Sequence, residues 1–114
     1  MSDINQIELS IEQARKLVDR KNQIEKLTSN REFRRVILDG YFTEEAARLA
    51  SIAGDPLHEK GRDDIMLSLQ AISKLRLFLH NSMIMGNMAE QELRDHMELL
   101  EETRAEELEQ GEVA

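Results

Sequence analysis

The residues that break helices are rare in this chain, and their scarcity is what most constrains its fold. One proline, Pro56, and five isolated glycines stand among 114 residues. Proline and glycine are the two residues least compatible with a helix interior. The stretches between them are rich in Glu, Leu, Ala, Arg and Met, which are good helix formers. The sequence therefore predicts an all-α protein.

The first 27 residues predict a long amphipathic helix that begins near Asp3. Its apolar residues alternate spacings of three and four, which is typical of a narrow coiled-coil seam: Ile4, Ile7, Ile11, Ala14 and Val18. The next two seam positions hold Lys21 and Glu25. We therefore expect the seam to end there and the helix to change partner midway.

Four interruptions divide the rest of the chain. They fall at residues 28–30, 39–40, 54–56 and 86–87, where Gly, Pro, Ser or Asn gather. Ser29 with Glu32 fits a capping box, and Gly40 suits a helix end. Asp63 and Asp64 suit the first turn of a helix, because carboxylates favour the positive end of the helix dipole. That helix carries a clean apolar stripe, made of Ile65, Leu69, Ile72, Leu75 and Leu79.

This pattern predicts a small helical bundle of four to five helices, with long N- and C-terminal helices. Residues 1–100 would form a single helical domain, and residues 101–114 an acidic tail that frays. The sequence leaves open whether the chain is kinked or broken at Gly86.

The sequence lacks the motifs that several kinds of chemistry require. The chain has no cysteine and no glycine-rich phosphate loop, and its three histidines have no partner at metal-binding spacing. We therefore expect no catalytic residue, no cofactor and no metal, and the protein is not expected to be an enzyme. No apolar run approaches the roughly 20 residues of a membrane span. The first ten residues do not resemble a signal peptide, so we expect a cytoplasmic protein that does not enter a membrane.

Charge is segregated along the chain. Residues 1–89 hold 13 acidic and 13 basic side chains, whereas residues 90–114 hold ten acidic side chains against two basic ones. The whole net charge of −8 thus lies in the last helix and its tail. Residues 15–35 form the opposite pole, with eight basic against three acidic side chains. The overall acidity, and the lack of aromatic residues between the cations, argue against nucleic-acid binding.

The segment 83–88 is unusually rich in methionine, with three in six residues. Methionine side chains are flexible and can repack against different partners, although they also fill irregular cores. Combined with the seam and the two charged poles, this segment predicts a set of protein-binding residues. They are Ile4, Ile7, Ile11, Arg31, Arg34, Arg35, Met83, Met85, Met88, Glu101, Glu102, Glu106 and Glu107.

Two stretches, Asn30–Pro56 and Gly86–Glu107, resemble small helical proteins that tailed bacteriophages encode. Those proteins belong to the gene block for head and tail morphogenesis. The resemblance implies a setting, namely the host cytoplasm and an association with the virion, but it implies no catalytic or ligand-binding residue.

We therefore expect a non-enzymatic phage structural protein or virion-assembly accessory, which binds protein partners and forms a homo-oligomer. The alternative is a small acidic regulatory protein, which inhibits a host nucleic-acid-processing or defence protein by binding it with the acidic helix.

Overall fold

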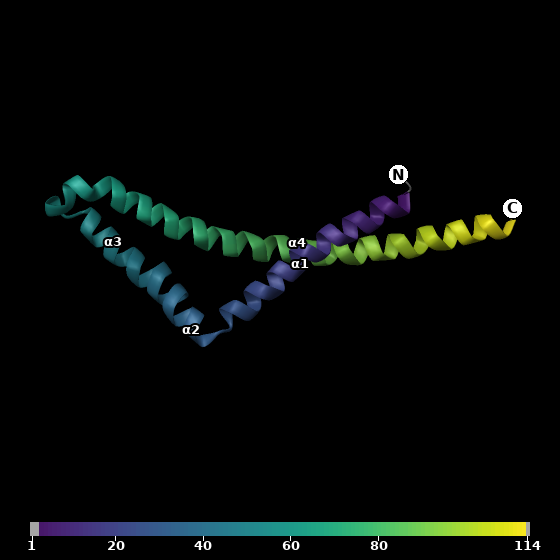
Figure 1. Cartoon of the computed structure of the whole chain (residues 1–114), viewed down its shortest axis with the longest axis horizontal. Coiled ribbons are helices and arrows are strands. Elements are labelled where there is room, and N and C mark those ends of the chain that lie inside the picture. The colour runs from purple at the N-terminus through teal and green to yellow at the C-terminus, as the bar shows by residue number, and fades with distance from the viewer. Residues whose placement is uncertain (1–2, 114) are drawn as a thin grey trace. The chain divides into compact units, whose positions relative to one another are not determined.

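The computed structural model describes residues 3–113, and the side chains of residues 3–111. Within this range the chain is all-α, which confirms the predicted fold class, and it contains no strand. Six helical elements follow one another (Figure 1). They are α1 (Asp3–Thr28), α2 (Arg31–Phe33), the π-helix η1 (Arg34–Glu45), α3 (Ala46–Ala53), the 3₁₀ helix η2 (Pro56–Gly61) and α4 (Arg62–Val113).

The prediction of a bundle of four to five helices is wrong. α2, η1 and α3 join without a gap, so residues 31–53 form one helical segment. α4 is a single helix of 52 residues that passes through Gly86. Neither Gly40 nor Gly86 has the positive φ of a glycine that ends a helix. A lone glycine costs a helix only about 1 kcal/mol relative to alanine, which packing of the neighbouring turns offsets.

α4 also runs past residue 100, where we placed the start of the tail, and continues to Val113. The domain boundary at residue 100 and the fraying of the tail stay predictions.

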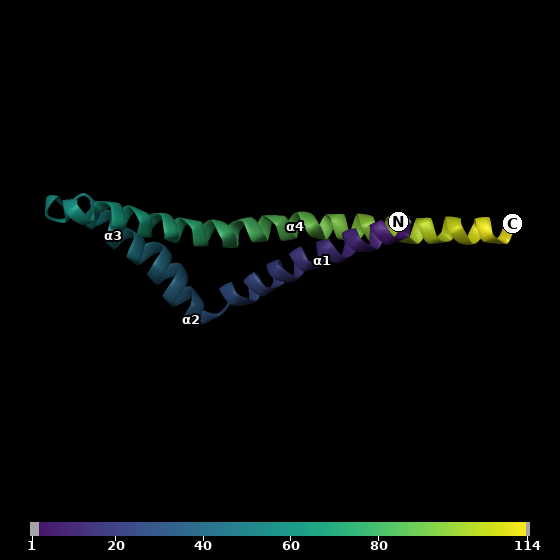
Figure 2. The same cartoon turned by 45° about the horizontal axis from the view of Figure 1, so that its top comes forward.

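The chain divides into two compact units, described here separately. Residues 3–22 and 82–113 form the helix-pair unit, in which the first part of α1 lies beside the second part of α4. Both views show the two helices running in opposite directions (Figures 1 and 2). Two ion pairs join them, Lys21 with Glu90 and Arg104 with Glu8. As the residue number rises along α1, the number of its partner in α4 falls, so the two helices are antiparallel.

Residues Gln23–Asn81 form the hairpin unit. Its core consists of Leu49 from α3 and of Ile65 and Ile72 from α4. Tyr41 and Phe42 of η1 pack against this core, and the guanidinium of Arg76 lies 5.9 Å from the centre of the Phe42 ring. Of the predicted apolar stripe, Ile65 and Ile72 lie in this core and Leu69 packs against it, whereas Leu79 is half-buried and Leu75 is exposed.

Caps explain where the helices of the hairpin unit begin. The Asn30 side chain accepts a hydrogen bond of 2.9 Å from the Phe33 N–H, so Asn30 is the N-cap and the predicted Ser29 is not. The Ser29 hydroxyl donates instead to the carbonyl of Glu25, one turn back in α1. The predicted interruption at residues 54–56 is confirmed, and the Asp55 side chain caps the Leu57 N–H there.

η1 was predicted as two helices separated at Gly40. The half-buried residues of η1 are Ile37, Leu38, Gly40, Tyr41, Phe42 and Glu45. The i→i+5 hydrogen bonds of this π-helix carry the backbone through Gly40 without a break. The Thr43 hydroxyl donates to the carbonyl of Leu38, five residues earlier.

Candidate protein-binding surfaces

The seam of α1 extends one position further than expected, to Lys21, whereas Glu25, the next position, is exposed as predicted. Ile7, Ile11 and Ala14 are buried, and Lys21, the next position of that register after Val18, is buried too. The prediction that Lys21 interrupts the seam is therefore wrong. The side chain is tolerated because its apolar stem packs along the seam while its ammonium reaches a carboxylate.

Gly86 explains how the two helices approach each other. A Cβ atom added there would lie 2.3 Å from the Cβ of Lys21, a distance that real side chains do not show. Ala89, one turn further along α4, is also buried, with 1 % of its surface exposed. Small residues on one helix let the backbone of the next come close. The glycine that the sequence marks as a break is thus a contact point between α1 and α4.

Two ion pairs cross the helix-pair unit and differ in burial. The Lys21 Nζ donates to the Glu90 Oε1 at 2.5 Å, and the two side chains are 11 % and 36 % exposed. The Arg104 Nη2 donates to the Glu8 Oε1 at 2.9 Å, with side chains that are 56 % and 48 % exposed. Lys21 and Glu90 are absent from the predicted set, although the seam spacing places Lys21 on the inner face.

We expect the more buried pair to matter more for stability. Replacing Glu90 with alanine removes the carboxylate from a largely buried ammonium, and should lower the free energy of unfolding by about 1–2 kcal/mol. Replacing Glu8 with alanine should cost about 0–1 kcal/mol, because exposed pairs contribute little. Urea denaturation of both variants measures the difference. Equal losses would mean that burial of the Lys21 pair adds nothing.

Each side of the helix pair carries a groove. One has a volume of about 360 Å³ and is lined by Asp3, Gln6, Ile7, Ser10, His96, Leu99 and Thr103. The other has a volume of about 420 Å³ and is lined by Glu8, Ile11, Glu12, Arg15, Met97, Leu100, Glu101 and Arg104. Ile7 and Ile11, which we predicted to bind a partner, thus already face α4 of the same chain, and Ile4 is half-buried.

The predicted methionines do not behave alike. Met83 is half-buried, whereas Met85 and Met88 are 49 % and 60 % exposed. Ile84 beside them is 43 % exposed. Ile84, Met85 and Met88, all within the helix-pair unit, are called the methionine patch below.

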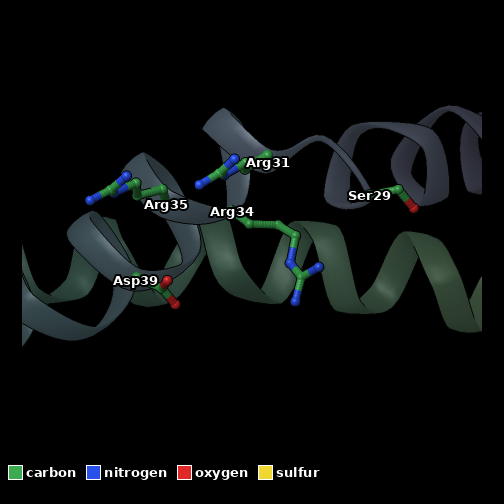
Figure 3. Close-up of a pocket in the computed structure, with 5 residues that line it drawn as sticks. All are labelled: Ser29, Arg31, Arg34, Arg35 and Asp39. Atoms are coloured by element: carbon green, nitrogen blue, oxygen red, sulfur yellow. The ribbon is translucent and has the colours of Figure 1, made fainter.

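The predicted arginines come together in the hairpin unit. Arg31, Arg34 and Arg35 line a hollow of about 650 Å³ with Ser29 and Asp39, and all five are exposed. Figure 3 shows Arg31 and Arg35 extending in the same direction, while Arg34 points away from them. Arg31, Arg34 and Arg35 are called the arginine cluster below.

The predicted acidic residues lie on α4 in the helix-pair unit. Glu101 lines one of the two grooves, and Glu102, Glu106 and Glu107 are exposed. The regular helix places them at fixed angles, which a frayed tail would not do.

One carboxylate has a shifted pKa, and it lies outside the predicted set. The hydrogen bond from Arg48 lowers the pKa of Glu45 below its ordinary value, and the positive charge of Arg48 adds to the effect. Both side chains are in solvent on the hairpin unit, so this pair is a surface feature of the helix.

Within residues 3–113, no group of three or more His, Asp or Glu side chains is placed to hold a metal ion. Over the same range, no helical stretch is both long and apolar enough to cross a bilayer.

No family model, no curated protein and no solved structure matches this chain.

Proposed function

We propose that this protein acts without catalysis, by binding other protein chains through its helical surfaces, its own copies included. The observation that carries the proposal is the balance between buried and exposed apolar side chains. Among the described residues, eight apolar side chains are buried and two of them are alanines, whereas fifteen large apolar side chains are exposed. Single exposed apolar residues are normal, but neighbouring ones mark interaction sites.

Exposed apolar residues gather in both units. The methionine patch provides three within five positions of α4 in the helix-pair unit. In the hairpin unit, Leu75, Leu77 and Phe78 are 39 %, 54 % and 51 % exposed. Association with a second chain would remove these surfaces from water, and each Met, Leu or Phe side chain fully buried contributes about 1.5–3 kcal/mol.

The setting that we propose is a tailed bacteriophage, where the protein would serve as a structural or virion-assembly accessory. The resemblance of Asn30–Pro56 and Gly86–Glu107 to small helical phage proteins supports this setting. Stoichiometric binding between helices is the kind of work that assembly requires. Copurification of the protein with phage particles or their precursors tests the setting, and its consistent absence from both would contradict it.

The exposed acidic residues of α4 favour a second candidate, a regulatory protein that inhibits a host protein. A rigid helix with a row of carboxylates can imitate the charge of a nucleic acid. Reversing Glu101, Glu102, Glu106 and Glu107 to lysine should then abolish binding to a purified nucleic-acid-processing target. Unchanged binding would exclude this candidate.

A substitution in the methionine patch tests the apolar part of the main proposal. Changing Met88 to glutamate should weaken self-association at least about tenfold, because it places a charge on a surface from which association would remove water. Changing Leu57 to glutamate is the matched control, since Leu57 is 89 % exposed and isolated on η2. Sedimentation equilibrium measures both dissociation constants. Equal effects of the two variants would show that the methionine patch is not the interface.

A further inference from the structure

We propose that the arginine cluster is a docking site for the acidic face of α4 on a second copy of this chain. The inference deepens the proposed function and rests on it, because it names one partner and one of the contacts. Four observations support it: the geometry of the cluster, the position of the acidic face, the matching spacing and the charge of the whole chain.

The geometry of the arginine cluster suits carboxylates. Arg31 and Arg35 lie about one turn apart on one helical segment and extend in the same direction, whereas Arg34 points away from them (Figure 3). All three are exposed, and no other described residue forms an ion pair with them. The planar guanidinium donates two parallel hydrogen bonds to a carboxylate, which makes arginine the preferred residue for such pairs.

The acidic face of α4 consists of Glu98, Glu102, Glu106 and Glu109. Successive spacings of four, four and three residues place these side chains on one side of the helix. All four are exposed, and none forms an ion pair with another described residue. Leu100 and Arg104, which face α1, lie on the opposite side of the helix. The acidic face is therefore turned away from α1 and open to another molecule.

The two surfaces share a spacing. Arg31 and Arg35 are one turn apart, and so are Glu98 and Glu102. Side chains one turn apart on a helix are separated by about 5–6 Å, so two arginines can meet two glutamates in register. Like charges one turn apart also repel within each helix, and a facing helix of opposite charge relieves that repulsion.

The charge of the chain favours a second copy over a nucleic acid as the occupant. A nucleic acid is negative along its whole length and is repelled by a chain of net charge −8, whereas the net charge of a second copy lies only in its residues 90–114. Asp39 also places a carboxylate in the hollow itself. A second copy supplies the acidic face in equal amount. Each copy has one arginine cluster and one acidic face, so every copy can supply either side of the contact.

Charge reversal in the full-length protein tests the inference. One variant carries R31E, R34E and R35E, and a second carries E98K, E102K and E106K. The control variant, K26E with K60E and K74E, makes the same change in net charge as the first variant, at three exposed lysines outside the arginine cluster. Circular dichroism first establishes that each variant is folded. Light scattering at about 50 mM salt, where surface charges act over long distances, then gives the mass.

We expect each reversal variant alone to associate at least about tenfold more weakly than the wild type, and the control variant to change less. An equimolar mixture of the two reversal variants should regain the wild-type mass. In the mixture one contact is of the natural kind and the other has both charges exchanged, whereas each variant alone brings like charges together.

Three outcomes would overturn the inference, and they separate it from the proposed function. Reversal variants that keep the wild-type mass would place self-association elsewhere, so that the proposed function stands and this contact falls. Monomeric variants that fail to associate when mixed would show that the two surfaces do not meet. A wild type that is monomeric at every concentration would remove both the contact and the proposed self-association. Binding of short DNA by the arginine cluster of such a monomer would assign the cluster to phosphate.

Discussion

Replacing Ile72 with alanine is expected to lower the free energy of unfolding by about 2–5 kcal/mol, the largest loss that we predict for a single substitution. Ile72 is 1 % exposed and is the one large side chain that is fully buried among the described residues. Truncation removes its burial and leaves a cavity between α4 and the α3 residues of the hairpin core, which cannot close completely. Urea denaturation followed by circular dichroism measures the loss.

The control for Ile72 lies on the same helix. Leu67 is 62 % exposed, so its replacement by alanine should cost less than about 1 kcal/mol. A similar loss from both substitutions would contradict the assignment of the hairpin core, because it would mean that burial in α4 does not decide stability.

The second large effect is expected at Gly86, and it runs against local helix propensity. Alanine is the better helix former by about 1 kcal/mol, so a glycine inside a helix is ordinarily improved by this change. At Gly86 the new Cβ would lie 2.3 Å from the Cβ of Lys21, which belongs to a stem that cannot swing away. The two helices must move apart, and we expect a net loss of about 1–3 kcal/mol.

Gly111 provides the matched control, because it also lies in α4 and an added Cβ would meet nothing within 4 Å. Its replacement by alanine should be neutral or stabilise the protein by up to about 1 kcal/mol. Thermal denaturation of the two variants should therefore shift in opposite directions. A stabilising effect at Gly86 would show that α1 and α4 do not approach each other there.

The same glycine explains why the fold was predicted only in part. Helix formers, the caps near residues 30 and 55, and the acidic first turn of α4 are local signals, and the all-α class follows from them. Gly86 and Gly40 carry the local signal of a helix end. At Gly86, however, the absence of a side chain leaves room for Lys21, which lies 65 positions away in the sequence. No local pattern distinguishes a glycine that ends a helix from one that admits another helix.

The candidate surfaces, like the fold, were predicted only in part. The arginine cluster and the acidic residues follow from charge counting, because charged side chains stay at the surface wherever the helices pack. Lys21 was not predicted to pack between the helices. A lysine that follows a run of apolar seam positions indicates the end of the seam unless its partner carboxylate is known. Glu90 lies 69 residues further along the chain, and only the antiparallel register of α1 and α4 brings it within reach.

The π-helix η1 could not have been predicted from the turn residues. Asp39, Gly40 and Thr43 together resemble the end of one helix and the start of another. The i→i+5 hydrogen bonds keep the segment continuous, and they carry Tyr41 and Phe42 onto the hairpin core.

We propose that this protein works by associating with protein chains, its own copies included. Light scattering on a size-exclusion column, at low and at high salt, gives the absolute mass of the particle and tests that claim most directly. We predict a discrete oligomer of the 13.2 kDa chain that shifts towards smaller species as salt rises. A monomer at both salt concentrations, over the whole accessible range of protein concentration, would contradict the account of self-association.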